Sequence, residues 1–202
     1  MAKKVIVLLA EGFEEVEAIT PIDYLRRAGI ELTVAAVGLK AKAGVLVVAG
    51  SHNIPVIADA ALETMAKEKK LAPSAWDGVV VPGGPGVDRL AASKETGAFL
   101  TEMAKAGKWI CAICAAPAKV LSPLGLLAGK KFTCYPGLED KVAAADSASP
   151  GAKWKKDRVV VDGSLITSRG AGTAGEFAYT VISKIVSEAE AKNLAEKVLL
   201  SY

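Results

Sequence analysis

The sequence predicts an α/β fold, a three-layer helix–sheet–helix sandwich with a mostly parallel sheet. Short apolar runs such as Val5-Ile6-Val7-Leu8-Leu9 have the pattern of strands that are buried on both faces, as in parallel sheets. Segments with helical periodicity alternate with these runs along the chain, which favours crossover connections. No repeat, linker or change in composition divides the sequence. We therefore expect a single domain of the flavodoxin-like type over residues 1–202.

The first half of the chain follows this alternation. After the strand at 5–9, an acidic segment opens a helix that ends near Gly29, a favourable C-cap. Pro21 leaves two alternatives: the helix begins at Thr20 with Pro21 in its first position, or a longer helix passes through Pro21. A second strand is expected at 32–37 and short broken strands between 45 and 57. Asp59 caps or precedes a helix that runs through Met65.

The second half continues in the same way. A buried strand at 76–81 ends in Pro82-Gly83-Gly84-Pro85-Gly86, and a helix follows at 96–106. Strands are expected at 109–113 and 130–135, and a surface loop at 143–151. The runs at 159–161 and 165–168 flank Asp162-Gly163 and predict a hairpin. Two amphipathic helices, one containing Phe177 and the other Leu194, close the chain.

Composition excludes several functional classes. Hydrophobic residues make up 51% of the 202 residues and charged residues 23%, as in a globular protein. A net charge of +3 is too small and too scattered to predict binding to nucleic acid or to a membrane surface. The N-terminus has no signal-peptide pattern, and three cysteines are an odd number. We therefore expect reduced thiols and a cytoplasmic location.

The segment around Cys114 is the strongest candidate for chemistry. The apolar run at 109–113 breaks into small residues at Cys114, and a helical segment with Pro117 in its first turn follows. A strand that turns sharply into a helix on small residues is a nucleophile elbow. We expect a positive φ at Cys114 and a thiol pKa below the ordinary value, because a helix N-terminus favours the thiolate. The alternative is a small buried hydrophobic residue.

Three pieces of the chain should meet at the carboxyl ends of the strands, where α/β sheets bind ligands. These are the acidic segment 11–17, the glycine–proline cluster 82–86 and the elbow at Cys114. At this point the sequence resembles the ThiJ/PfpI superfamily, in the branch of the parkinsonism-associated protein deglycase and its bacterial relatives. The resemblance extends over nearly the whole chain. Its carriers are Glu14-Glu15-Val16-Glu17, Pro21-Ile22-Asp23, Arg26-Arg27-Ala28-Gly29, Val81-Pro82-Gly83-Gly84, Ala112-Ile113-Cys114-Ala115 and Thr167-Ser168-Arg169-Gly170.

The resemblance implies roles for four residues. Cys114 matches the family's reactive cysteine, and Glu17 matches the carboxyl that shares a hydrogen bond with it. Gly84 and Ala115 match positions whose backbone N–H groups face the site and can stabilise an oxyanion. The alternative for Glu17 is an ordinary carboxylate in the first turn of a helix, where the helix dipole favours it.

The chain departs from the family pattern at three positions. Tyr135 stands where many relatives have a histidine, and a phenol is a poor base at neutral pH, which disfavours a Cys–His hydrolase. His52, the only histidine, stands where relatives carry an arginine implied to line a dimer contact, and a surface or interface role is the preferred interpretation. Ala171 replaces a common proline, which we expect to loosen its loop. Tyr135, Gly83 and Cys134 are further candidates for lining the site.

The remaining thiols have simpler interpretations. Cys111 and Cys114 form a C-x-x-C pattern, but strand alternation should point Cys111 to the opposite face, so we expect core packing rather than a disulfide. Cys134 is a candidate resolving thiol. With one histidine and no cluster of thiols, the sequence supports no metal site, and we expect no cofactor.

Two functions compete on the same residues. The resemblance implies a cysteine-dependent, cofactor-free enzyme of the glyoxalase III or protein deglycase type, which acts on methylglyoxal-like α-oxoaldehydes or their early adducts. The alternative is an oxidative-stress sensor or protective chaperone in which Cys114 is oxidised to sulfinate. The resemblance and the apolar residues of the first helix also predict a homodimer.

Overall fold

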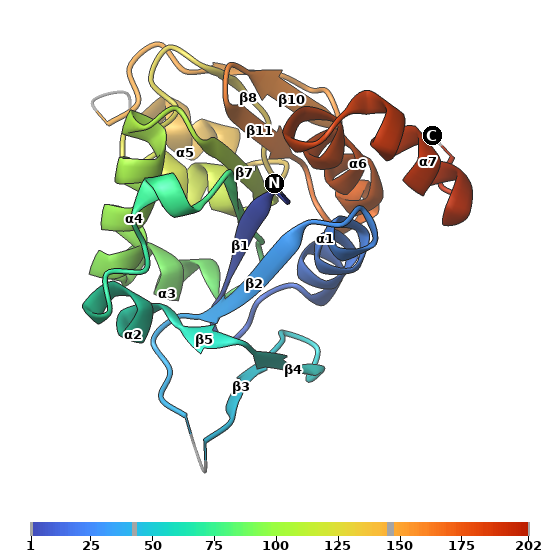
Figure 1. Ribbon diagram of the computed structural model, residues 1–202. Coiled ribbons are helices and arrows are strands. Elements are labelled where there is room, and N and C mark those ends of the chain that lie inside the picture. The colour runs from blue at the N-terminus through green and yellow to red at the C-terminus, as the bar shows by residue number, and fades with distance from the viewer. Residues whose placement is uncertain (1, 42–43, 145–147, 202) are drawn as a thin grey trace.

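A computed structural model describes residues 2–41, 44–144 and 148–201 of the chain (Figure 1). In this part of the chain, seven strands form the main sheet in the order β10-β11-β7-β6-β1-β2-β5. Every neighbouring pair is parallel except β10–β11, the hairpin at one edge. The predicted mostly parallel sheet and the terminal hairpin are confirmed. The strands are β1 (Lys4–Leu9), β2 (Glu31–Ala36), β5 (Ala60–Ala61), β6 (Gly78–Val81), β7 (Trp109–Ile113), β10 (Val159–Asp162) and β11 (Leu165–Ser168).

Two smaller β-elements and the helices complete the chain. The antiparallel hairpin β3–β4 (Leu46–Ala49 and Pro55–Ala58) lies below the main sheet in Figure 1, and β8 (Lys131–Phe132) pairs with β9 (Lys153–Trp154). The helices are α1 (Glu15–Arg27), α2 (Leu62–Lys67), α3 (Val87–Ala92), α4 (Lys94–Lys105), α5 (Glu139–Ala144), α6 (Ala174–Ile185) and α7 (Glu188–Lys197). Short helical turns are η1 (Pro73–Ala75), η2 (Pro117–Leu121) and η3 (Ala171–Thr173).

Alternation along each buried strand builds two apolar layers. In β1, Ile6 and Leu8 pack into the cluster under α2, α3 and α4, whereas Val5 and Leu9 pack into the cluster under α1 and α6. Figure 1 shows these helices on opposite faces of the sheet. Because both faces are covered, the strands are apolar throughout, which is why continuous apolar runs predicted them.

Three local expectations need adjustment. The first helix is the longer of the two alternatives, with Pro21 inside it. The expected strand at 130–135 is reduced to the two residues of β8, whose partner β9 lies far along the chain. The helical segment after the elbow begins at Pro117 as expected, but it is only the five-residue π-helical turn η2. Of the loop expected at 143–151, residues 145–147 lie outside the described residues.

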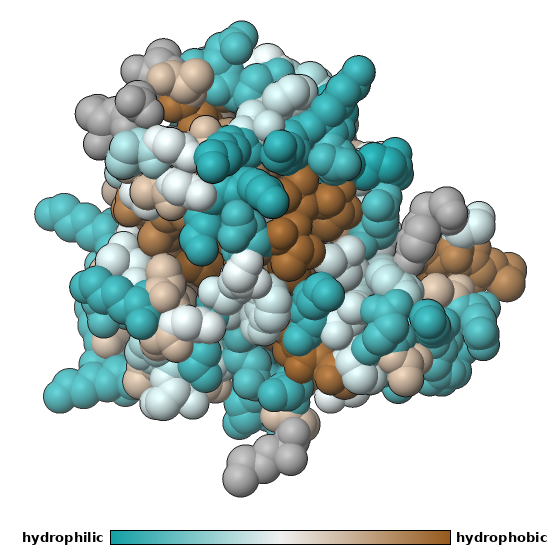
Figure 2. Space-filling model, turned by 90° about the horizontal axis from the view of Figure 1, so that it is seen from above, coloured by the Kyte–Doolittle hydropathy of each residue, from teal (hydrophilic) through white to brown (hydrophobic). Residues whose placement is uncertain are grey.

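Figure 2 looks onto the molecule from the top of Figure 1. Hydrophilic side chains cover much of this surface, and apolar patches lie between them. Within the described residues, no helix is long and apolar enough to cross a membrane.

Candidate active site

Four neighbouring strands, β11, β7, β6 and β1, bring the predicted segments together at their carboxyl ends. Backbone hydrogen bonds join the loops: the Glu14 N–H donates to the Gly83 carbonyl at 3.0 Å, and the Gly86 N–H donates to the Gly12 carbonyl at 2.8 Å. The loop after β1, the glycine–proline loop after β6 and the elbow after β7 therefore form one site. This is the edge of the sheet where open α/β folds bind ligands.

Cys114 occupies a strained elbow. Its φ is +65°, a left-handed conformation that few residues other than glycine adopt, so the predicted positive φ is confirmed. Both of its backbone groups are bonded: its N–H donates to the Ser168 carbonyl at 2.9 Å, and its carbonyl accepts from the Tyr135 N–H at 2.8 Å. These two bonds attach Cys114 to Ser168 and to Tyr135. Contacts with two other segments of the chain therefore hold the strained conformation in place. The side chain is 9% exposed.

Glu17 faces Cys114 from the first turn of α1. Its own N–H is capped by the Glu14 carboxylate at 2.7 Å, which fixes the start of the helix. Its side chain is buried, 1% exposed, and its carboxyl shares a hydrogen bond with the Cys114 thiol. The Gly83 N–H donates to Glu17 Oε2 at 2.9 Å, and the Ala171 N–H donates to the same carboxyl. We refer to Cys114 and Glu17 below as the dyad.

Gly83 allows the Glu17 and Cys114 side chains to come into contact. A Cβ atom at this position would lie 2.5 Å from Glu17 Oε2 and 2.9 Å from Cys114 Sγ. Such distances are too short for any side chain, so only glycine permits the contact. Gly84 is required for a different reason: its φ is +87°, and a Cβ there would lie 2.5 Å from the Glu14 nitrogen. The close approach at Gly83 and the positive φ of Gly84 therefore explain the two glycines of the Pro-Gly-Gly motif.

Burial and the shared hydrogen bond change how the dyad titrates. Burial raises the pKa of Glu17 to about 7, although hydrogen bonds from Cys114 and from the Gly83 and Ala171 amides lower it in part. Burial and the negative charge of Glu17 raise the pKa of the Cys114 thiol to about 12, while the Gly84 and Ala115 amides lower it. Between these two values the pair holds one proton.

The sequence prediction of a lowered thiol pKa is therefore wrong. Burial of the Cys114 thiol is the main cause of its raised pKa, and the negative charge of Glu17 raises that pKa further. The helix that should stabilise the thiolate is only the short turn η2. When Glu17 carries the shared proton, its repulsion is absent and the thiolate keeps a hydrogen-bond donor.

The other predicted lining residues differ in their positions. The Gly84 and Ala115 amides point at the Cys114 sulfur, as the resemblance implied. Tyr135 is 52% exposed and lies next to Gly170, close to Glu17. Cys134 is completely buried and packs into the apolar cluster under α2–α4, whereas Cys114 packs into the cluster under α1 and α6. This placement gives no support to a resolving role for Cys134.

Cys111 needs a correction. It is fully buried core, as expected, and all three cysteines are free thiols. However, Cys111 packs into the same apolar cluster as Cys114, not on the opposite face. Strand alternation ends at Ile113, and the left-handed turn at Cys114 redirects the next side chain. The separation of the two thiols is therefore along the strand, not across the sheet.

His52 belongs to a second polar cluster that the sequence did not predict. The His52 N–H donates to Glu15 Oε1 at 2.5 Å, its Nδ1 lies 2.9 Å from Glu15 Oε2, and the Ser51 hydroxyl donates to the same oxygen at 3.1 Å. Burial raises the pKa of Glu15, but these hydrogen bonds outweigh it and lower that pKa to about 2. The bond to Glu15 raises the pKa of His52. Ala171, the third departure from the family pattern, contributes its backbone N–H to Glu17.

In the described part of the chain, one group of three residues, Glu14, Glu15 and His52, has potential metal-ligating atoms within 4.8 Å of one another. The Glu14 carboxylate already caps the Glu17 N–H, and Glu15 is held by His52 and Ser51. These side chains therefore already have a structural task, fixing α1 and the hairpin β3–β4 to each other.

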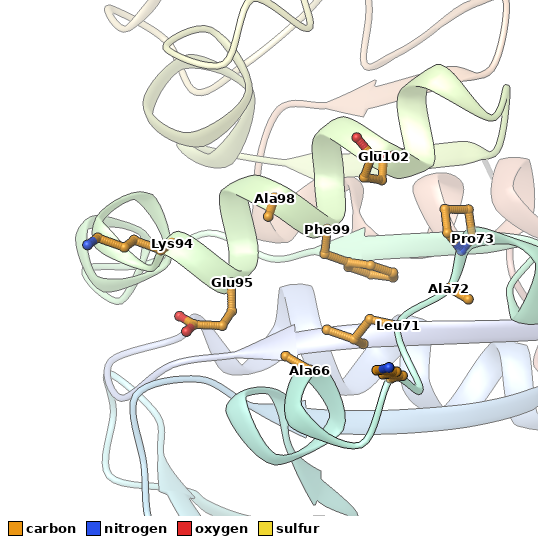
Figure 3. A pocket seen from close by; sticks show the side chains of 10 residues that line it. Ala66, Leu71, Ala72, Pro73, Lys94, Glu95, Ala98, Phe99 and Glu102 are labelled. Atoms are coloured by element: carbon orange, nitrogen blue, oxygen red, sulfur yellow. The ribbon is translucent and has the colours of Figure 1, made fainter.

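A well-formed cavity of about 500 Å³ lies elsewhere, between α2, η1 and α4. Figure 3 shows Phe99 and Leu71 pointing toward each other across it, with Lys94 and Glu95 at one end. No residue of the dyad lines this cavity. The dyad and this apolar cavity therefore lie in different places in the fold.

Comparison with known proteins identifies the class to which this fold and site belong. The model of the DJ-1/PfpI family matches residues 3–184, so the chain is a member of the DJ-1/PfpI family. The protein dj-1beta of Drosophila melanogaster is 37% identical over 204 residues, which cover 100% of both chains. The solved structure of oxidised DJ-1 from Toxoplasma gondii has a TM-score of 0.86 and 35% identity, again over 100% of both chains.

Two relatives have enzymatic names. A deglycase of Pyrococcus abyssi is 33% identical over 169 residues, 84% of this chain and 91% of the relative. A glutathione-independent glyoxalase of Caenorhabditis elegans is 31% identical over 196 residues, 97% of this chain and 95% of the relative. Against two DJ-1 homologues of Arabidopsis thaliana, at 36% and 35% identity, the chain spans only 46% and 41% of their length.

Proposed function

We propose that the protein is a cofactor-free enzyme that converts α-oxoaldehydes such as methylglyoxal, or their early adducts with amines and thiols, into hydroxy acids. The observation that carries this proposal is the dyad: a buried thiol and a buried carboxyl that share one proton at the carboxyl edge of the sheet. The names of the glyoxalase and deglycase relatives support the substrate class.

The shared proton suggests an order of steps. With the proton on Glu17, the Cys114 thiolate attacks the aldehyde carbon and forms a C–S bond. The new alkoxide takes the proton from Glu17, giving a hemithioacetal and a free carboxylate. Glu17 then removes the proton from the former aldehyde carbon and returns it to the neighbouring carbon, which leaves a thioester. Water hydrolyses the thioester, releasing the hydroxy acid and the thiol, so no electrons enter or leave.

Two backbone N–H groups support the charged stages. The Gly84 and Ala115 amides point at the sulfur, so they lie beside any oxyanion that forms on the carbon bonded to it. Because both are fixed main-chain groups, they need no rearrangement during the reaction.

Turnover of methylglyoxal by the purified protein tests the proposal, measured by the appearance of lactate. We expect turnover by the native chain and its loss in Cys114→Ser, which keeps the size of the side chain but replaces the sulfur. Lactate formation by Cys114→Ser at the native rate would exclude the thiol mechanism.

A second function is favoured by one comparison, the relative from Toxoplasma that is described as oxidised. In this reading Cys114 is a peroxide sensor: its thiolate reacts with two equivalents of peroxide to give the sulfinate and two waters. Mass spectrometry after mild peroxide should then find two added oxygens on Cys114 first, since Cys111 and Cys134 are 0% exposed. Earlier modification of either buried thiol would contradict this assignment.

We also propose that the chain forms a homodimer in a reducing, cytoplasmic environment. Large apolar side chains are exposed on α1 and on the adjoining hairpin β3–β4, among them Val16 at 48%, Val47 at 49% and Ile57 at 69%. The two elements are joined through the Glu15–His52 contacts, so they present this surface together. Exposed apolar surface of this kind is typical of protein interfaces.

A further inference from the structure

Tyr135 places an exposed aromatic ring beside the dyad. Its backbone is fixed to the elbow, because the Tyr135 N–H donates to the Cys114 carbonyl at 2.8 Å. Its ring lies next to Gly170: the point where a Gly170 Cβ would stand is 3.7 Å from Tyr135 Cδ2. The same point is 3.7 Å from Glu17 Oε1. The ring and the reacting carboxyl therefore lie on the same side of Gly170, within reach of one small group placed there.

About half of Tyr135 is accessible to solvent (52%), and its hydroxyl makes no hydrogen bond with the residues that the structure describes. Covering this exposed aromatic ring with an apolar part of a ligand is favourable, because the contact removes apolar surface from water. A small substituent such as a methyl group would leave most of the ring in water, whereas a flat apolar group would cover it.

We propose that Tyr135 determines the substrate specificity of the dyad by contacting the R group of R–CO–CHO. The inference rests on the proposed function and makes it more specific: aryl α-oxoaldehydes, with R a flat apolar ring, are preferred to methylglyoxal. The reaction is R–CO–CHO plus water giving R–CHOH–COOH, and all bond changes remain with Cys114 and Glu17. Tyr135 contacts only the group that does not react.

The first test compares phenylglyoxal with methylglyoxal in the native chain, Tyr135→Phe and Tyr135→Ala. We expect Tyr135→Ala to lower kcat/KM for phenylglyoxal roughly three- to tenfold, the effect of one aromatic contact, mainly through KM. Its kcat/KM for methylglyoxal should fall by a smaller factor, because a methyl group covers less of the ring. Tyr135→Phe keeps the ring and should keep the preference. All variants retain the backbone bond to Cys114, so a general disturbance of the elbow would affect both substrates equally.

Gly170→Ala provides an independent test at the neighbouring glycine. A Cβ there makes ordinary contacts at 3.7 Å, so the variant should fold, and its methyl group would contact both the ring and the Glu17 carboxyl. We expect it to reduce turnover of phenylglyoxal more than that of methylglyoxal. An unchanged ratio of the two substrates in both Gly170→Ala and Tyr135→Ala would overturn the proposal.

Binding of the products separates this proposal from the proposed function, because it requires no turnover. Mandelate, the product from phenylglyoxal, should bind the native chain more tightly than lactate in calorimetry, and Tyr135→Ala should remove the difference. If neither oxoaldehyde is turned over but mandelate selectivity depends on Tyr135, the role of Tyr135 stands and the enzymatic function falls. If selectivity is absent or survives in Tyr135→Ala, the role of Tyr135 falls, whatever the turnover.

Discussion

At the scale of single residues, the site depends on one proton shared between two buried groups. Both groups, a thiol and a carboxyl, are common protein side chains. Burial and mutual repulsion oppose the simultaneous ionisation of the Cys114 thiol and the Glu17 carboxyl. A solvent-exposed pair with the same spacing would be coupled less strongly, because water screens the repulsion. The degree of burial is therefore as important to the proposed chemistry as the identity of the two residues.

The pH dependence of activity follows from this pair. Below the raised pKa of Glu17, about 7, both groups are protonated and no thiolate is available. We therefore expect kcat/KM for an oxoaldehyde to increase as pH rises through about 7. Glu17→Gln should remove this transition and lower activity by roughly 10²–10⁴-fold, the usual contribution of a general base. A pH–rate profile from pH 5 to 9 measures both effects, and an unchanged midpoint in Glu17→Gln would assign the transition to another group.

The dyad should tolerate no side chain at position 83. In Gly83→Ala the added methyl group would collide with Glu17 Oε2 and Cys114 Sγ, so we expect activity to fall at least about 100-fold. Gly172→Ala is the matched control, since nothing lies within 4 Å of its Cβ position. Methylglyoxal turnover, with circular dichroism to verify folding, distinguishes the two. Native activity in folded Gly83→Ala would show that the contact between Glu17 and Cys114 is dispensable.

At the scale of elements, the junction between α1 and the hairpin β3–β4 is held by a buried carboxylate. Gly50 is necessary there, because a Cβ at that position would overlap the Glu15 side chain. The junction also determines where α1 begins, and α1 carries Glu17. Stability of the hairpin and placement of the Glu17 carboxyl are therefore linked through neighbouring residues of one helix.

Glu15→Gln should weaken this junction in a pH-dependent manner. The native Glu15 pKa lies below that of the unfolded chain, so its contribution is complete above about pH 4.5 and is lost as pH falls toward 2. At pH 6 we expect a loss of about 1.5–3 kcal/mol in the free energy of unfolding, as for a charged hydrogen bond. Urea denaturation at pH 6 and pH 3 measures the difference. Glu11→Gln, at an exposed position in the same loop, is the control; equal losses in both variants would argue against the junction.

Prediction from the sequence succeeded where a feature depends on neighbours along the chain. The run before Cys114 and the small residues after it define the elbow, and Asp162-Gly163 defines the hairpin. Prediction from the sequence failed where contacts between distant segments determine a strand length or a pKa. The strand at 130–135 is limited by its pairing with β9, and the pKa of Cys114 is raised by burial and by a carboxylate almost a hundred residues away in the chain. The Glu15–His52 contacts left no local pattern at all.

At the scale of the whole molecule, the exposed apolar surface of α1 and β3–β4 predicts an association of two copies. Light scattering should give twice the chain mass of 20.8 kDa at micromolar concentration. Ile57→Lys introduces a charge at a 69% exposed position on β4 and should shift the protein toward the single-chain mass. Leu199→Lys, at an 89% exposed position beyond α7, should leave the mass unchanged. A native mass near that of one chain would count against the dimer.

The two hydrogen bonds of the Cys114 backbone, to Ser168 and Tyr135, also limit how often the elbow can separate from its neighbours. The amide protons of Cys114 and Tyr135 both lie in hydrogen bonds to other segments at the sheet edge, so they exchange with solvent only when that edge separates. We expect hydrogen–deuterium exchange at these two amides to be as slow as in the middle of β1. Faster exchange would mean that the strained cysteine spends part of its time relaxed. A slow rate would instead mean that Cys114 keeps its left-handed conformation for as long as the sheet stays folded.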